Sequence, residues 1–323
     1  MKKLNLKNRL LLEFGITALG YILLVMLMRI GVLKSYWQGI LITICINVIL
    51  TVSLNMTAGF LGELALGHAA FMAAGAYASA VFTKSMRLLP IIEFPIAILI
   101  GGIVAMILGL LVCLPTLRLR GDYLAIITLA FGEIVRNVLI NLKVLGGAGG
   151  YSAIAKNTTF TWAFALAAIT VFLSLSLIHS RHGRSIIAIR EDEIAAESSG
   201  INTQKYKIIT FLYSAFFAGV GGALYAHYMG FLQPSVFTLD KSIEILVMVV
   251  LGGMGSIFGS IVSASVLTLL PEVLRSVSDY RMLVYSIVLI LMMLVKHAPQ
   301  MQRFSSQSPR HTIAHTCHLD LAP

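Results

Sequence analysis

Charged residues are scarce in this sequence of 323 residues. Lysine, arginine, aspartate and glutamate make up only 12% of the chain, whereas soluble domains carry about 25%. Mean hydropathy is +0.90, and 58% of the residues are hydrophobic. This scarcity excludes an ordinary soluble domain. A spanning helix needs about 20 largely apolar residues, and the chain has room for about ten such spans and little else.

Alternating polar and apolar strands are also lacking. Strands of an outer-membrane barrel alternate over about 10 residues, but the apolar runs of this chain are far longer. Backbone polar groups inside membrane lipid must be satisfied within their own segment, which favours helices. We therefore predict an all-α polytopic membrane protein with about 8–10 transmembrane helices, some of them broken or half-length.

Motifs for metal or nucleotide binding are missing as well. The three cysteines, Cys45, Cys113 and Cys317, form no CxxC pair, so neither a disulfide framework nor a zinc site is indicated. The sequence has no GxxxxGK[ST] motif and cannot bind ATP through a P-loop of its own. We expect no bound cofactor. The net charge of +10 could suggest a nucleic-acid partner, but the basic residues lie between apolar runs, where they set orientation.

The apolar runs predict a topology with both termini in the cytoplasm. Leu10–Ile30 is too long for a signal-peptide core, and residues 1–9 precede it as a cytoplasmic segment. Basic residues are more numerous in the proposed inner segments than in the outer ones, as the positive-inside rule requires. The remaining predicted spans are Trp37–Met56, Leu64–Phe82, Ile91–Leu114, Asp122–Leu142, Thr161–Ile178, Ile208–Tyr228, two short spans in Ser242–Leu274 divided near Gly252–Gly255, and Met282–Val295.

The transmembrane domain is thus predicted to cover residues 10–296, and a polar tail follows over residues 297–323. The tail lacks apolar periodicity and is predicted to be disordered. Four potential metal ligands lie close together in it, namely His311, His315, Cys317 and His318. Their spacing could suit a transition metal, but no packed second shell is apparent, so we predict no metal site.

Ser180–Lys207 is the longest polar run of the chain and is predicted to lie in the cytoplasm. Asp192 and Glu193 begin a short helical pattern, where acidic residues oppose the helix dipole. Gly200 is a suitable residue to follow its end. Such a helix could insert a small apolar patch, formed by Ile187, Ile194, Ala195 and Ile201, into a groove on another protein. The same pattern also fits a solvated connector.

Several motifs, in order, resemble the LivM-type permease of branched-chain amino acid ABC importers. They are SLNMTAGFLGELALGHAAFMAAGAYASA (Ser53–Ala80), RLRGDYLAIITLAFGEIVRN (Arg118–Asn137), GRSIIAIREDEIAAESSGI, FLYSAFFAGVGGALYA and LGGMGSIFGS. The resemblance covers about Ser53–Met293. It implies a permease of the cytoplasmic (inner) membrane that moves branched-chain, or similar small apolar, amino acids inward by alternating access. It also implies three kinds of partner: a LivH-type second permease, two ATP-binding cassette subunits that hold ATP and Mg, and an extracytoplasmic amino-acid-binding protein.

The resemblance further implies that part of the central run docks in a cleft of the ATP-binding subunit. The residues of this coupling loop are Arg190, Glu191, Asp192, Glu193, Ile194, Ala195, Ala196 and Gly200. Related permeases serve urea, amides and other amino acids, so the substrate stays open. Two other classes also stay open: an ion-coupled secondary carrier, for which Glu133 is the deepest carboxylate, and a scaffold subunit that transports nothing.

Asn55, Gly59 and Gly62 interrupt an apolar run, and broken helices at membrane depth are tolerated where they line a cavity. These residues and His68 are therefore candidates for a translocation cavity. Ordinary close packing and a hydrogen-bonded core histidine are the alternatives.

Glu133 and Arg136 lie three residues apart, hence on one helix face, and are predicted to form an intramembrane ion pair. Charged residues at membrane depth are costly unless they are paired. The remaining candidates are glycines that could serve either close helix packing or a hinge, namely Gly252, Gly253, Gly255 and Gly259.

Overall fold

The computed structural model describes residues 21, 25–26, 35–86, 90–116, 122–273 and 290. Several sequence predictions concern residues outside these ranges. They are the cytoplasmic segment 1–9, most of the first span, most of the last span, and the tail with its histidines and Cys317. The predicted domain limits at residues 9 and 296 also lie outside the described residues.

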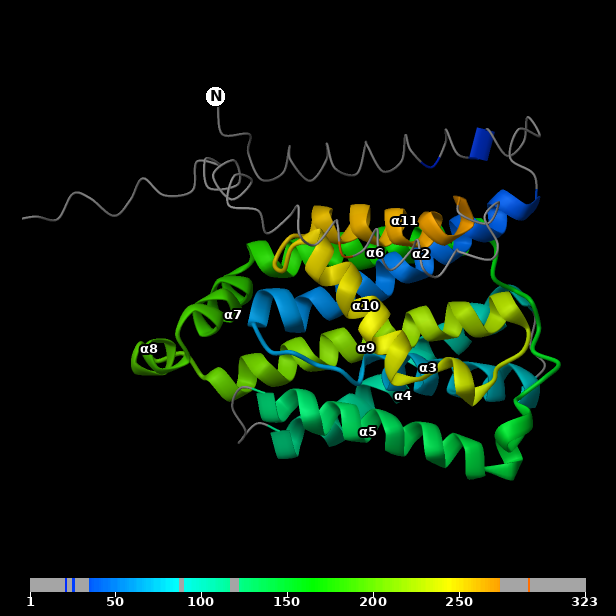
Figure 1. The fold of residues 1–323 in the computed structure, drawn as a ribbon, viewed down its shortest axis with the longest axis horizontal. Coiled ribbons are helices and arrows are strands. Elements are labelled where there is room, and N and C mark those ends of the chain that lie inside the picture. Colours follow the sequence, from blue (N-terminus) through cyan, green and yellow to red (C-terminus); the bar gives the residue numbers. More distant parts are fainter. Residues whose placement is uncertain are drawn as a thin grey trace, which may run out of the picture. The chain divides into compact units, whose positions relative to one another are not determined.

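Helices make up most of the described chain (Figure 1). Within the described ranges no β-strand is present, and one isolated bridge joins Tyr151 to Leu232. Short helical turns lie at Lys143–Leu145, Gly147–Gly149 and Pro234–Val236, and a π-helical segment covers Met56–Leu61. The α-helices are α2 (Ser35–Asn55), α3 (His68–Ser85), α4 (Pro90–Thr116), α5 (Asp122–Asn141), α6 (Phe160–His179), α7 (Arg181–Glu191), α8 (Glu193–Ser198), α9 (Thr203–Met229), α10 (Leu239–Gly252) and α11 (Ile257–Val273).

Five of the described helical segments are long and apolar enough to cross a membrane. They are Ser35–Leu61, Ile92–Thr116, Tyr123–Asn141, Phe160–His179 and Thr203–Met229. The predicted division of the run after Ser242 is also confirmed, because α10 ends at Gly252 and α11 begins at Ile257. The all-α polytopic fold is therefore confirmed.

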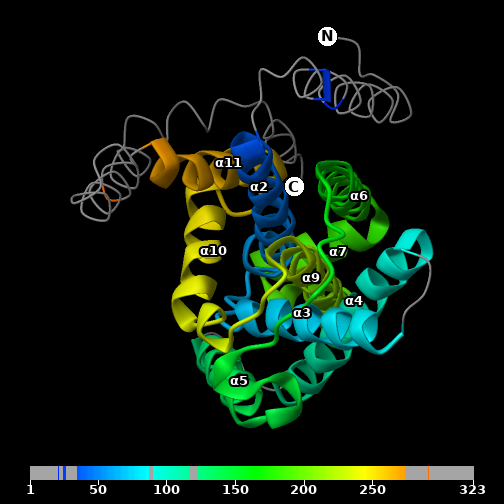
Figure 2. The same cartoon turned by 90° about the vertical axis from the view of Figure 1, so that its right-hand side faces the viewer.

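Helix α9 lies among α2, α3 and α4 (Figure 2), and most of its side chains are buried. Glycines let the backbones meet there. A Cβ on Gly222 would collide with the carbonyl oxygen of Met72 in α3, and one on Gly75 would collide with the backbone of Gly219. Small residues at helix crossings allow this close approach inside membranes, where packing rather than the hydrophobic effect drives association. These glycines therefore serve close packing.

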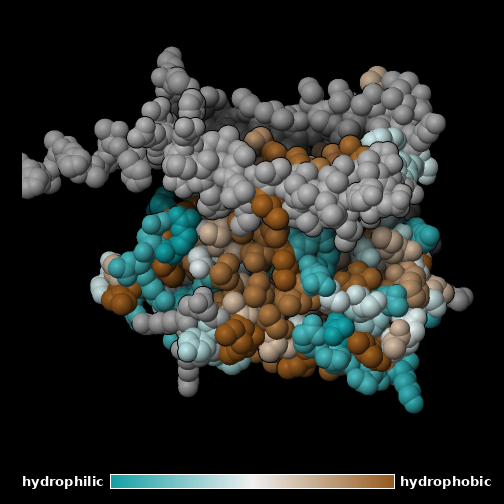
Figure 3. All heavy atoms as spheres, in the orientation of Figure 1, coloured by the Kyte–Doolittle hydropathy of each residue, from teal (hydrophilic) through white to brown (hydrophobic). Residues whose placement is uncertain are grey.

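The outer surface of α4 is apolar. Leu99, Ile103 and Ile107, four residues apart, are all exposed, and this spacing places them on one face of the helix. In Figure 3 hydrophobic side chains likewise gather over the middle of the described helices, and hydrophilic ones gather at the end that holds α7 and α8. An apolar belt next to polar ends is the surface expected of a protein that lies in a bilayer.

Contacts divide the chain into two compact units, Met1–Leu269 and Leu270–Pro323. The second unit has few described residues, all of them in the last turn of α11 or at residue 290. The contacts discussed below all lie in the first unit.

Candidate functional site

Helix α8 is short but capped at both ends. Oδ1 of Asp192 accepts hydrogen bonds from the backbone N–H groups two and three residues later, at 2.9 and 3.0 Å. At the other end Gly200 has φ +83°, and its N–H donates to the carbonyl of Glu197. The N–H of the next residue donates to the carbonyl of Ala196. These two bonds form a Schellman motif, and they agree with the predicted helix and its predicted end at Gly200.

The exposed part of the apolar patch expected on this segment consists of Ile194 and Ala195. The side chain of Ile194 is 65% exposed, whereas Ile187 and Ile201 are partly buried. Figure 1 shows α8 at one end, away from the long helices. The helix thus presents one large apolar side chain with Ala195 beside it, an arrangement suited to insertion into a partner.

Lys207, near the start of α9, ties α8 to the spanning helices. Its Nζ lies 2.6 Å from Oε1 of Glu63 and 2.9 Å from Oε1 of Glu193, and its side chain is only 7% exposed. A buried charge must be paired, or it destabilises the fold. Sequence reasoning missed this site, although a lysine in the first turns of an apolar helix was a signal. Its partners come from two other segments, and no local pattern indicates them.

Helix α2 changes to π geometry after Asn55. The π-helical segment Met56–Leu61 ends at Gly62, which has φ +83° and donates its N–H to the carbonyl of Thr57. The predicted span ends at Met56, but the helix continues to Leu61 because the wider turns keep its backbone groups hydrogen-bonded. Single π turns inside α-helices occur often at functional sites.

Asn55 joins this segment to the turn between α10 and α11. Its Nδ2 donates to the carbonyl of Ser256 at 3.1 Å and to Oγ of Ser260 at 3.0 Å. Its Oδ1 accepts from the N–H of Gly255 at 2.9 Å. The side chain is 0% exposed. A Cβ on Gly59 would overlap both Oδ1 of Asn55 and the backbone nitrogen of Gly255, so the contact requires a glycine there.

Arg190, in the last turn of α7, also contacts the π-helical segment and the turn between α10 and α11. Its Nη1 donates to the carbonyl of Gly59 at 3.0 Å, and its Nη2 donates to Oε1 of Glu191 at 2.6 Å. A Cβ on Gly62 would lie 2.7 Å from its Cγ, and one on Gly255 would lie 2.9 Å from its Nη1. We call Asn55, Gly59, Gly62, Arg190 and Gly255 the Arg190 junction.

The glycines of the α10–α11 turn have separate structural reasons. Gly253 and Gly255 have φ of +95° and +80°, which other residues rarely adopt. A Cβ on Gly252 would lie 2.6 Å from the carbonyl of Gly259, so the two helices touch through their backbones. Packing and turn geometry therefore account for all three, and hinge motion at this turn stays a prediction.

His68 begins α3 and is 1% exposed. Its Nε2 lies 2.9 Å from Oγ of Ser53, which also donates to the carbonyl of Leu50. Ser214 of α9 donates to the carbonyl of Ser53 at 2.8 Å. The histidine thus belongs to a buried hydrogen-bonded group that joins α2, α3 and α9, as expected of a core histidine.

Helix α5 carries polar side chains on an accessible face. Arg136 donates through Nε and Nη2 to Oε2 of Glu133 at 2.9 and 2.7 Å, and these side chains are 29% and 34% exposed. Asn137 and Asn141 are exposed one turn apart. We call these four residues the polar face of α5. Charged groups at membrane depth rarely face lipid, so protein or water is expected to cover this face.

The structure thus groups the sequence candidates in a new way. Three sets that lie far apart in the chain meet at the Arg190 junction: the coupling loop, the break after Asn55 and the turn at Gly255. The ion pair of Glu133 and Arg136 lies on a different helix, together with two asparagines that sequence reasoning missed.

Residues 36–295 match the family model described as the permease component of the branched-chain amino acid transport system. The chain belongs to this family. It is 37% identical over 284 residues to the high-affinity branched-chain amino acid transport system permease protein LivM of Escherichia coli. That alignment covers 77% of this chain and 66% of the relative. The chain therefore spans slightly less than two thirds of the LivM protein that it matches.

Two other relatives share shorter stretches with this chain. A probable LivM of Methanocaldococcus jannaschii is 28% identical over 201 residues, 58% of either chain. The permease protein LivH of Escherichia coli is 33% identical over 134 residues, 41% of this chain and 42% of the relative. No solved structure matches the chain at a significant level.

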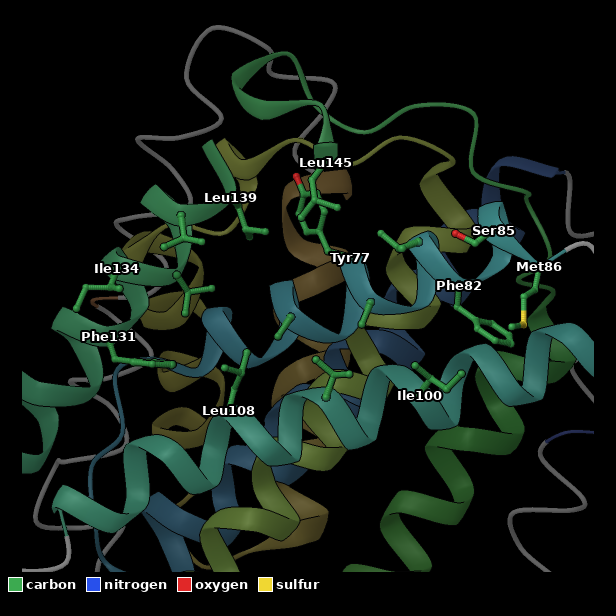
Figure 4. A pocket seen from close by; sticks show the side chains of 16 residues that line it. Tyr77, Phe82, Ser85, Met86, Ile100, Leu108, Phe131, Ile134, Leu139 and Leu145 are labelled. Carbon is green, nitrogen blue, oxygen red and sulfur yellow. The ribbon is translucent and has the colours of Figure 1, made fainter. Parts of the chain in front are cut away.

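The chain also has an apolar groove between α3, α4 and α5 (Figure 4). It has a volume of about 700 Å³, and side chains such as Phe82, Ile100 and Phe131 line it. Tyr77 and Ser85 contribute the hydroxyl groups of its wall. A zwitterionic solute would lose its hydrogen bonds to water there with little compensation. The groove therefore suits apolar chains better than the charged groups of an amino acid.

Proposed function

We propose that the chain is the membrane-spanning permease subunit of an ATP-driven importer of branched-chain amino acids. The family match and the LivM and LivH relatives support this proposal. The chain itself would hydrolyse no ATP. Two ATP-binding cassette subunits would bind ATP and Mg, and an extracytoplasmic binding protein would deliver the amino acid.

The capped helix α8 is the observation that carries the proposal. It exposes Ile194 while Lys207 and Arg190 tie its base to the spanning helices. An element with this combination can receive force from a soluble partner and pass it on. In the proposed orientation the chain lies in the inner membrane, and α8 faces the cytoplasm. Both termini lie on the cytoplasmic side as well.

The polar face of α5 supports a second permease subunit of the LivH type. Its four polar side chains are accessible along the second half of α5, where a lipid neighbour would be unfavourable. We place the translocation path between this face and the partner permease. Alternating access would then open that path first to the outside and later to the cytoplasm.

Reconstitution with the partner permease and the ATP-binding subunits tests this function. The wild-type complex should take up labelled leucine with ATP and not without it. Ile194→Arg should abolish co-purification of the ATP-binding subunits and lower uptake at least about tenfold, because a charge enters an apolar contact. The permease itself should keep its thermal unfolding temperature.

Val144→Arg is the matched control. Val144 is also exposed, 86%, but lies in the short helical turn after α5, so this variant should retain the ATP-binding subunits. Uptake that persists without ATP would favour an ion-coupled carrier, and no uptake at all would favour a scaffold. Either result would overturn the proposal, and competition with urea, amides and other amino acids would define the substrate class.

A further inference from the structure

We propose that Arg190 is the positioning residue that carries movement of α8 to two breaks in the spanning helices. These breaks are the π-helical segment Met56–Leu61 and the turn between α10 and α11. The inference rests on the proposed function, because it requires a partner subunit that moves α8.

The Arg190 side chain occupies a slot that two glycines, Gly62 and Gly255, leave open. Its Cγ lies against Gly62, and its guanidinium lies beside Gly59 and Gly255. The carbonyls in the last turn of a helix lack partners within the helix, and Arg190 supplies one for Gly59 at 3.0 Å. A side chain larger than hydrogen at any of these glycines would displace the arginine or strain the backbone. The slot is thus shaped for this one side chain.

The two breaks are already joined to each other. Asn55 immediately precedes the π-helical segment, and it bonds to the N–H of Gly255 and the carbonyl of Ser256 in the other break. Gly59 also touches Gly255 closely enough to exclude a Cβ. A force on Gly59 therefore reaches both segments, although about 200 residues of chain separate Asn55 from Gly255.

Arg190 is also close to the helix that would receive the force. Asp192 alone separates α7 from α8 and caps α8, so Arg190 lies two residues from the cap. A shift of α8 must therefore move the end of α7. The planar guanidinium is held in place by Glu191 as well as Gly59, and it keeps its orientation better than a lysine ammonium would. Lys207 holds α8 through a flexible side chain and serves as a tether.

The exposure of Arg190 separates this role from a structural one. Its side chain is 36% exposed, so its ion pair with Glu191 adds little to stability. Loss of the guanidinium should therefore leave the permease folded. Loss of the guanidinium should instead lower the amount of solute taken up per ATP hydrolysed, because the movement of α8 would no longer be passed on.

The test compares Arg190→Gln and Arg190→Lys with Arg184→Gln in the reconstituted importer. Arg184 is exposed on the same helix, α7. ATP hydrolysis and leucine uptake are measured in the same vesicles. For Arg190→Gln, hydrolysis should stay within about twofold of wild type, and uptake per ATP should fall at least about tenfold. Arg190→Lys should be intermediate, because one amine can still bond the Gly59 carbonyl.

Arg184→Gln should behave as wild type. An unchanged ratio of uptake to ATP in Arg190→Gln would overturn the inference. If the wild-type complex shows no ATP-dependent uptake, the proposed function fails instead.

Amide hydrogen exchange on the purified chain tests, independently of transport, whether Arg190 joins the two breaks. Arg190→Gln should speed exchange at residues 59–63 and 253–256 by roughly tenfold, and Arg184→Gln should not. Unchanged exchange at either segment would show that Arg190 does not join the two breaks.

Discussion

Two regions of polar groups in the spanning helices are treated in opposite ways by the fold. At the Arg190 junction and beneath α8, Asn55 and Lys207 are buried, and each makes more than one polar contact. On α5, Glu133 and Asn137 remain accessible. The first region buries its polar groups in contacts between segments far apart in the chain. The polar groups of α5 bond within their own helix and stay accessible to water or another protein.

This difference teaches which polar residues of a membrane chain can meet a solute. A buried amide that makes three hydrogen bonds, such as that of Asn55, would have to break some of them to bind anything else. An accessible polar face is free to do so without unfolding. The polar face of α5 is therefore the stronger candidate for the translocation path.

Removal of Lys207 should give the largest effect. Lys207→Gln would leave Glu63 and Glu193 facing each other without their shared cation, and we expect a loss of about 3 kcal/mol in unfolding free energy. Unfolding of the purified protein in detergent measures this loss. A loss below about 1 kcal/mol would mean that the ion pairs of Lys207 behave like surface salt bridges. The two regions would then not differ in the way described above.

The second-largest effect is expected from a matched pair of asparagine substitutions, which should differ in their loss of stability. Asn55→Leu leaves the N–H of Gly255 without its partner and should cost about 2 kcal/mol. Asn137→Leu, on the accessible face, should change stability by less than about 0.5 kcal/mol. Thermal unfolding of both variants provides the measurement. Equal losses would show that α5 is as tightly packed as the junction.

Thiol labelling should sharpen the same contrast. In a Cys317→Ser background, Asn137→Cys should react with a membrane-impermeant maleimide at least about tenfold faster than Ser53→Cys. The native Cys45 and Cys113 are buried and should add little background. Addition of the second permease should protect Asn137→Cys. Equal rates without that partner would contradict the proposed accessibility of α5.

The smallest effect is expected at the ion pair of α5. Glu133→Gln should lower the unfolding free energy by less than about 1 kcal/mol, because both side chains are about one-third exposed and the interaction is screened. Denaturation at low and high salt tests this point. A loss above about 3 kcal/mol would indicate a buried pair and would erase the distinction between the two regions.

Sequence patterns predicted the local elements well. The length of apolar runs placed most spanning helices, and Gly252–Gly255 correctly marked the division between α10 and α11. Asp192 and Gly200 marked the ends of α8, because caps depend on residues within one or two turns. These features follow from short-range chemistry that the sequence displays directly.

Long-range pairings could not be predicted in the same way. The bond from Arg190 to Gly59 and those from Asn55 to residues 255–260 join segments far apart in the chain. Their geometry depends on how the helices pack, which periodicity does not indicate. For the same reason the π-helical continuation after Asn55 and the double ion pair of Lys207 were missed. The accessible face of α5 was missed too, since exposure depends on which neighbours cover a helix.

The two caps of α8 also bear on how readily a complex assembles. A helix of six residues has too few internal bonds to persist by itself in water, yet the Asp192 cap, the Schellman turn and Lys207 hold it in shape. Ordering a flexible segment costs roughly 1 kcal/mol or more per residue. A partner that docks on α8 meets a surface already folded, so its binding energy is not consumed by folding the segment. Assembly and release can then be fast without the contact having to be large.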